Sequence, residues 1–150
     1  MENTITDLLD AIIPKLDTLI GDMRTWMSLA LIIGPVLFIV MGLFYLFLAP
    51  PEANHKLGYR TYFGMGSLAA WKFTQKLAGI VWSALGVVMA VVAIIGCIIM
   101  LAQAPTDASS TALVIVIMEA VAALAAFLAI EITVLIRFDI NGTDRFKKKK

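Results

Sequence analysis

Two carboxylates are the only charged side chains inside the long apolar stretches of this sequence. Glu119 and Glu131 lie in the stretch 108–136, which contains no other Asp, Glu, Lys or Arg. A charged group at the centre of a membrane costs roughly 3 kcal/mol on insertion scales, so it usually faces protein or water. Twelve residues separate the two, which places them roughly 18 Å apart along a helix and on different faces. They therefore cannot act together as a general acid and base.

Each carboxylate has its own interpretation. We expect Glu131 to form a structural pair with a loop cation such as Arg60. For Glu119 two interpretations remain open: a neutral, hydrogen-bonded carboxyl buried against protein, or a group that relays protons or cations.

Other chemistry has little support in the sequence. Cys97 is the only cysteine and His55 the only histidine, so paired metal ligands are absent from the sequence and we predict no metal site. No nucleophile–base pair or phosphate-binding loop occurs at a workable spacing, so we expect no catalysis and no cofactor. We interpret Cys97, which lies inside an apolar stretch, as a packing residue.

The elements that must position these residues are three apolar stretches. Of the 150 residues, 61% are apolar and only 23 are charged, and the ranges 25–51 and 77–106 contain no charge. This distribution excludes an ordinary soluble domain and intrinsic disorder. Because about 20 apolar residues cross a membrane as a helix, we predict an all-α membrane protein with three transmembrane helices at 26–48, 77–102 and 111–137.

We predict that the membrane domain 24–146 is followed by a polybasic tail, 147–150, and preceded by an amphipathic helix in the segment 1–23. Its apolar residues recur every three or four positions, and its polar face carries Glu2, Asp7, Asp10, Asp17 and Asp22. It either extends the first span along the membrane interface or a neighbouring subunit, or it offers a docking surface to a basic partner.

Lys and Arg residues predict the orientation in the membrane. Ten of the twelve lie in the loop 50–76 or after the third span, whereas the N-terminal segment has two and the loop 103–110 has none. By the positive-inside rule, we expect the N-terminus outside and the C-terminus in the cytoplasm. Lys147 to Lys150 would then anchor the tail to anionic lipid.

Small residues form a stripe on each of the last two spans. Small residues at this spacing allow close helix packing, so we predict that the two stripes face each other or a symmetry mate in a homo-oligomer. The stripe of the second span contains Gly79, Ser83, Gly86, Ala90, Ala93 and Cys97, and that of the third contains Ala122, Ala126, Ala129 and Thr133.

Two motifs flank the last two spans. The loop motif combines turn-forming residues with an interfacial aromatic–guanidinium pair and consists of Asn54, Gly58, Tyr59, Arg60, Thr61 and Trp71. Ser67 is a candidate cap for the helix that follows. The tail motif contains a turn that ends the third span and consists of Glu131, Phe138, Asp139, Asn141 and Gly142.

The loop and tail together resemble the SdpI family of small bacterial membrane proteins. Trp71, Gly79 and Trp82 also match positions of that family. The resemblance implies an immunity protein of the bacterial inner membrane that protects a cell from a secreted peptide toxin. It also implies a signalling role, in which a regulator is recruited to the membrane.

We therefore expect a multi-pass protein that binds or neutralises a membrane-active peptide without catalysis. Its partners would be the lipid bilayer, a peptide toxin, a membrane-recruited regulator and further copies of the chain, but no nucleic acid. The alternative is a small transporter, or an accessory or assembly subunit, that uses the buried carboxylate of Glu119.

Overall fold

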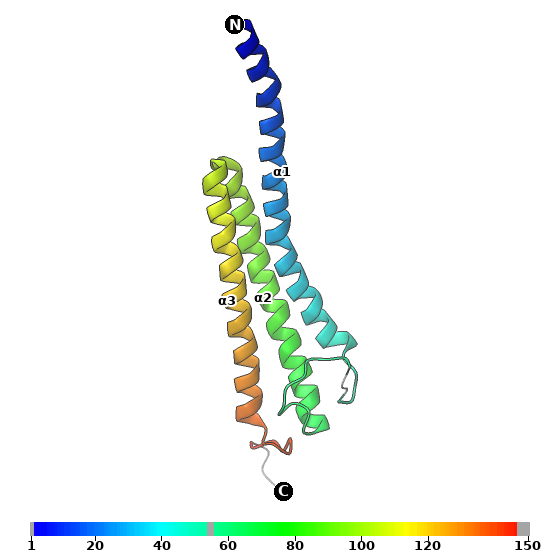
Figure 1. The fold of residues 1–150 in the computed structure, drawn as a ribbon. Coiled ribbons are helices and arrows are strands. Elements are labelled where there is room, and N and C mark those ends of the chain that lie inside the picture. Colours follow the sequence, from blue (N-terminus) through cyan, green and yellow to red (C-terminus); the bar gives the residue numbers. More distant parts are fainter. Residues whose placement is uncertain (1, 54–55, 147–150) are drawn as a thin grey trace.

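The protein is a bundle of three long helices, seen in a computed structural model that describes residues 2–53 and 56–146. The elements are α1 (Glu2–Leu43), a π-helical turn η1 (Phe44–Leu48), α2 (Leu68–Ala102) and α3 (Pro105–Arg137). A short turn joins α2 to α3, whereas a longer loop joins η1 to α2 (Figure 1). Asn54, His55 and Lys147 to Lys150 lie outside the described residues.

Three segments of the described chain are long and apolar enough to cross a membrane: Ile12–Leu48, Leu68–Ala102 and Pro105–Arg137. Their outward faces expose large aliphatic side chains such as Val87, Val91 and Ile98. Lipid chains solvate such faces, whereas water would not. The predicted fold class, an all-α membrane protein with three transmembrane helices, is confirmed.

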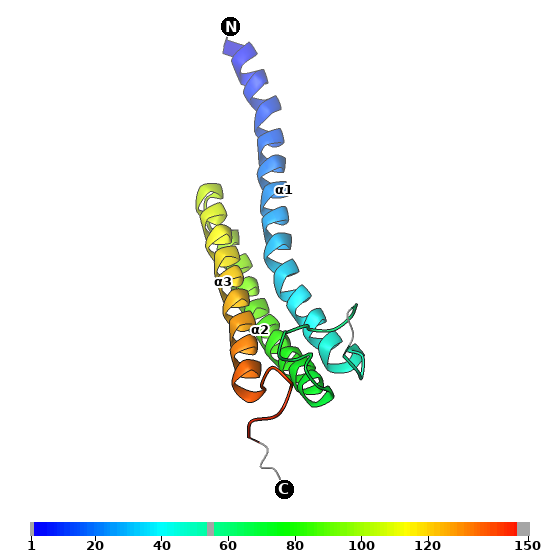
Figure 2. The same ribbon diagram turned by 60° about the horizontal axis from the view of Figure 1, so that its bottom comes forward.

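The first span and the segment before it form one continuous helix. α1 runs through Pro14 and Pro35 and projects beyond the turn between α2 and α3 (Figures 1 and 2). Its axis changes direction between the blue and cyan parts of the ribbon, as a proline inside a helix favours. The side chains of Glu2, Asp7, Asp10 and Asp17 lie outside the described set, so the acidic amphipathic character stays a prediction.

The small residues of α2 pack against α1. A Cβ atom on Gly86 would lie 2.7 Å from the backbone nitrogen of Ile39 and 2.8 Å from the carbonyl oxygen of Pro35. One on Gly79 would lie 2.9 Å from the carbonyl oxygen of Gly42. The backbones of α1 and α2 therefore approach closely because side chains are missing on both helices.

The stripe of α2 contacts both neighbouring helices, and its contact with the stripe of α3 or with a symmetry mate stays a prediction. On α3, Ala126 is buried and Ala129 and Thr133 are exposed. Ala93 and Cys97 of α2 pack in one cluster with Ala112 and Ile115 of α3, whereas Gly79 and Gly86 lie against α1. Gly42 of α1 supplies the complementary surface. The backbones of α1 and α2 can approach closely here because both helices lack side chains at these positions.

Two clusters of buried side chains hold the bundle together. One lies near the turn between α2 and α3 and contains Leu31, Ala93, Met100, Ala108, Ala112 and Ile115, with Cys97 packed against it. The other lies near the loop and the tail and contains Tyr59, Ala70, Ala78, Trp82, Ile130, Val134 and Phe138. Both therefore combine residues from at least two chain segments that are distant in sequence.

Candidate functional site

The loop and the tail meet at one end of the bundle, around the first turns of α2. Figures 1 and 2 show this end opposite the N-terminus of α1. We call the described loop residues 49–53 and 56–67, the tail residues 138–146 and α2 residues 68–78 the loop-and-tail platform. It contains the described residues of the loop motif and all of the tail motif except Glu131, which lies on α3.

Gln75 fixes the loop motif to α2. The Tyr59 backbone N–H donates to Gln75 Oε1 over 2.8 Å, and Gln75 Nε2 donates to the Tyr59 carbonyl over 2.7 Å. The Gln75 side chain thus pairs with the loop backbone as a neighbouring strand would. Both residues are buried, so the two hydrogen bonds satisfy groups that have no access to water.

Gly58 allows the loop to pass over Trp71. Its φ of +108° lies in the region that only glycine adopts easily, and a Cβ there would lie 2.6 Å from Cη2 of Trp71. The indole Nε1 of Trp71 donates to the carbonyl of Pro50 over 2.8 Å. Trp71 therefore joins the start of the loop, just after η1, to the first turns of α2.

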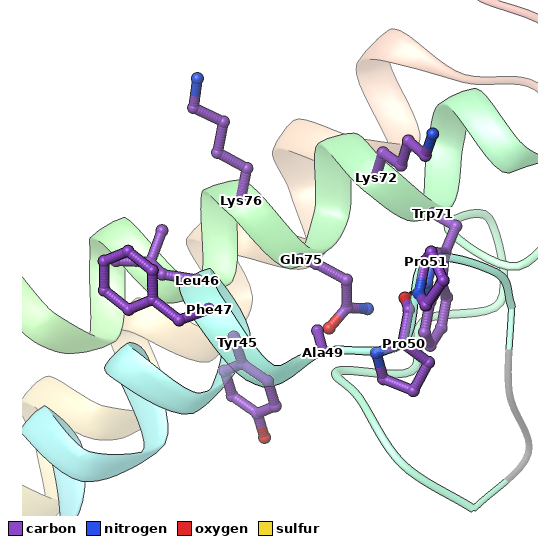
Figure 3. Close-up of a pocket in the computed structure, with 10 residues that line it drawn as sticks. All are labelled: Tyr45, Leu46, Phe47, Ala49, Pro50, Pro51, Trp71, Lys72, Gln75 and Lys76. Carbon is purple, nitrogen blue, oxygen red and sulfur yellow. Dashed lines mark hydrogen bonds between the residues drawn. The ribbon is translucent and has the colours of Figure 1, made fainter.

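A pocket of about 280 Å³ opens between η1 and α2, beside Trp71. In Figure 3, Trp71 stands against Pro50 and Pro51, whereas Lys72 and Lys76 point to the other side of α2 from Gln75. The two lysines therefore border the pocket without converging on it. The lining residues are Tyr45, Leu46, Phe47, Ala49, Pro50, Pro51, Trp71, Lys72, Gln75 and Lys76.

Thr61 and Gly64 form a compact turn inside the platform. The Gly64 N–H donates to Thr61 Oγ1 over 2.7 Å, and a Cβ on Gly64 would lie 2.6 Å from Thr74 Oγ1. Thr61 and Thr74 are both buried. The glycine here serves close packing against α2.

Ser67 connects the loop to the tail. Its hydroxyl accepts the N–H of Ala70 over 3.1 Å and donates to the carbonyl of Gly142 over 2.6 Å. The predicted N-cap of the helix is therefore confirmed, and the same oxygen also holds the tail. Gly142 has a φ of +70° and lies directly against the backbone of Gly66 and Ser67.

Asp139 organises the turn that follows α3. Its Oδ1 accepts the backbone N–H groups of Asn141 and Thr143, over 3.0 and 2.7 Å. This is the turn chemistry expected of an aspartate. Phe138 before it is buried and forms a single β-bridge with Asp144, so the tail folds back onto the end of α3.

Arg137 adds an ionic contact to this end. Its Nε lies 3.3 Å from Asp144 Oδ2, and its guanidinium carbon lies 4.3 Å from the ring centre of Phe73. A guanidinium over an aromatic ring is stabilised by the ring's electron-rich face. Arg137 therefore links the end of α3 to both the tail and α2.

The side chain of Tyr59 packs between the helices and so connects the loop motif to the bundle. Its ring packs edge-on against Tyr45, with centroids 5.5 Å apart, and lies 6.3 Å from the ring of Phe127. Burial, together with the nearby charge of Glu131, raises the pKa of the Tyr59 phenol above its ordinary value. Its buried hydroxyl has no hydrogen-bond partner in the structure.

The two carboxylates occupy separate environments. Glu131 is half-buried near Tyr59, and Arg60 is exposed, so the pairing of Glu131 with Arg60 stays a prediction. Glu119 lies away from the platform, buried against Gly34 of α1. The described residues contain no group of three His, Cys, Asp or Glu side chains that could hold a metal ion.

Several residues that build the platform were not predicted as site residues. Gln75, Thr74, Phe73 and Asp144 all make the contacts described above. One signal was available: polar Thr74 and Gln75 fall within the helical stretch that also contains Trp71. A polar pair on a helix next to an apolar span predicts a contact with non-helical backbone.

The fold and the platform define a multi-pass α-helical membrane protein whose connecting loop and C-terminal tail are fixed to one helix. The chain belongs to the SdpI/YfhL protein family, because that family's model matches residues 51–131, more than half of the chain. The match contains the loop, α2 and most of α3, and ends at Glu131. No curated protein and no solved structure matches the chain.

Proposed function

We propose that this protein is an immunity or resistance protein of the bacterial inner membrane that binds a membrane-active peptide and neutralises it without catalysis. Membership of the SdpI/YfhL family carries this proposal. In the platform, the side chains of Gln75, Ser67 and Trp71 bind backbone groups of the loop and the tail, which fixes the family-matched loop to α2.

The proposed orientation places the platform in the cytoplasm and the free end of α1 outside. Ten of the twelve Lys and Arg residues belong to the loop 50–76 or follow the third span, which favours the cytoplasmic side. α1 projects past the bundle at the opposite end (Figure 1). A peptide that arrives from outside would meet this projecting helix first.

Charge complementarity suits the projecting helix to a cationic peptide. Residues 2–22 contain five acidic and one basic side chain, and opposite charge accelerates encounter. The described side chains Ile12, Leu16, Leu19 and Met23 expose apolar surface on the same segment. An amphipathic cationic peptide would find both contacts there.

The direct test is protection of living cells. A sensitive bacterial strain that expresses the chain is challenged with a panel of cationic and anionic membrane-active peptides. We expect a several-fold higher inhibitory concentration for a cationic peptide. Neutralising Asp10, Asp17 and Asp22 to Asn should reduce this protection, whereas Asp107→Asn, on the same side but outside α1, should not.

Equal sensitivity with and without the chain, across the panel and with the protein detected in the membrane, would contradict the immunity function. Protection that survives the triple substitution would contradict only the role of the projecting helix and would leave the immunity function standing.

A second candidate is a transport or accessory function that uses Glu119. The observation that favours it is a carboxyl only 7% exposed whose Oε1 has no hydrogen-bond partner, because such groups mark ion and proton paths in membranes. Glu119→Gln should then abolish uptake or efflux of protons or cations by vesicles that contain the protein. Unchanged flux would remove this candidate.

A further inference from the structure

Glu119 occupies a gap that α1 leaves open for it. The side chain is 7% exposed, and its Oε1 is buried without a hydrogen-bond partner. Opposite it lies Gly34, where a Cβ atom would come 2.5 Å from Glu119 Oε2. The carboxyl of α3 therefore reaches the backbone of α1 at a position where α1 has no side chain.

Pro35 leaves an acceptor without its usual donor at the same level. An α-helical carbonyl accepts the N–H four residues later, and Pro35 has no N–H to give to the carbonyl of Leu31. Leu31 is fully buried and packs in one cluster with Ile115, which precedes Glu119 by one turn of α3. A carbonyl that lacks its usual helical donor and a carboxyl whose Oε1 has no hydrogen-bond partner among the described residues therefore occur on neighbouring turns of α1 and α3.

No opposite charge faces this carboxyl. The range 25–51, which contains the membrane part of α1, has no charged residue, nor has the range 77–106, which contains that of α2. On α3 the nearest charges are the carboxyls of Asp107 and Glu131, each twelve residues away. An ionised Glu119 would be buried without compensation, which is costly in a membrane. A protonated Glu119 supplies an O–H donor, which is what the Leu31 carbonyl lacks.

We propose that Glu119 is a proton-binding site, in which the carboxylic acid keeps its proton and donates it in a hydrogen bond to the carbonyl oxygen of Leu31. The bond joins α3 to α1 across the gap at Gly34, on the side of the bundle away from the loop-and-tail platform. This site goes beyond the immunity function and does not depend on which peptide is bound.

The protonation state is measured by infrared spectroscopy on the full chain in lipid vesicles. The spectrum of the wild type minus that of Glu119→Gln should contain the C=O stretching band of a protonated carboxylic acid. Glu131→Gln is the matched control and should leave this band in place. A difference spectrum with only carboxylate bands would overturn the proposal.

The hydrogen bond is measured by a double-substitution cycle on the thermal midpoint of unfolding. Glu119→Leu should lower the midpoint in the wild type but much less in Pro35→Ala, where residue 35 regains an N–H for the Leu31 carbonyl. Equal lowering in both backgrounds would overturn the proposed partner.

A third comparison decides the matter if Pro35→Ala does not fold. Glu119→Gln keeps a hydrogen-bond donor on a side chain of similar length. It should therefore lower the thermal midpoint of unfolding much less than Glu119→Leu does. If Gln and Leu lower the midpoint equally, the donor role is wrong.

Discussion

At the residue scale, Gln75 is the side chain that fixes the loop motif to α2. It pairs with both backbone groups of Tyr59 inside the protein. A buried N–H or carbonyl that loses its partner costs about 1–3 kcal/mol. The loop motif therefore keeps its conformation through a helix residue that is not part of the motif.

Replacing Gln75 with Ala should lower the free energy of unfolding by about 2–4 kcal/mol, because two buried backbone groups lose their partners. The measurement is a denaturant titration of the purified protein in detergent micelles. Lys76→Ala, at the exposed neighbouring position, is the matched control and should change little. If Gln75→Ala is as stable as the control, the prediction is wrong, and water forms the hydrogen bonds to Tyr59 that the Gln75 amide forms in the wild type.

Tyr59 predicts a pH dependence on the alkaline side. Burial and the nearby Glu131 raise the pKa of its phenol above the ordinary 10.0. Above pH 10 the unfolded chain loses this proton while the folded chain retains it, so the stability falls as the pH rises. Comparing unfolding at pH 8 and pH 11 should show a smaller loss for Tyr59→Phe than for the wild type. Equal losses would mean that Tyr59 ionises freely in the folded protein.

At the element scale, the close contact of α1 with α2 determines how the bundle packs. Missing side chains at Gly42, Gly79 and Gly86 allow the two backbones to touch. The sequence predicted the small stripe of α2, but not its partner. Gly42 lies between large residues, with Val40 and Met41 before it and Leu43 and Phe44 after it, so its role follows only from the packed structure.

Gly86→Ala should lower the free energy of unfolding by about 1–3 kcal/mol, because the new Cβ meets backbone atoms that cannot move aside. Val87→Ala at the next position, which faces outward, should change it by less than about 0.5 kcal/mol. Both are measured by the same micelle titration. Equal effects would show that α1 can shift to accept a methyl group.

At the scale of the whole molecule, the proposed orientation in the membrane rests on the charges of the two ends. We expect Ser109→Cys, in the first turns of α3, to react with a membrane-impermeant maleimide on intact cells. Lys72→Cys on the platform should react only after the cells are opened. Both variants carry Cys97→Ser, which removes the single native cysteine. The reverse labelling pattern would contradict the proposed orientation.

The three spans could be predicted because hydrophobicity is a local property of the chain. Length and the absence of charge suffice to identify a membrane helix, and turn-forming residues such as Ser67 and Asn141-Gly142 bound the last two. Helix α2 starts at Leu68, after the predicted cap Ser67 and nine residues before the apolar span at 77, and the N-terminal segment is continuous with the first span. The length of an apolar run indicates the part of a helix that lies in the membrane. The helix itself can extend beyond that part, because its backbone hydrogen bonds do not depend on apolar side chains.

The sequence by itself therefore determined the fold class, the motifs and the identity of the two carboxylates. Only the tertiary structure decided that Gln75 holds Tyr59, that Ser67 holds Gly142, and that Glu119 faces Gly34. These contacts join residues 16, 75 and 85 positions apart. Their partners depend on how the helices pack in space, which periodicity along one helix does not specify.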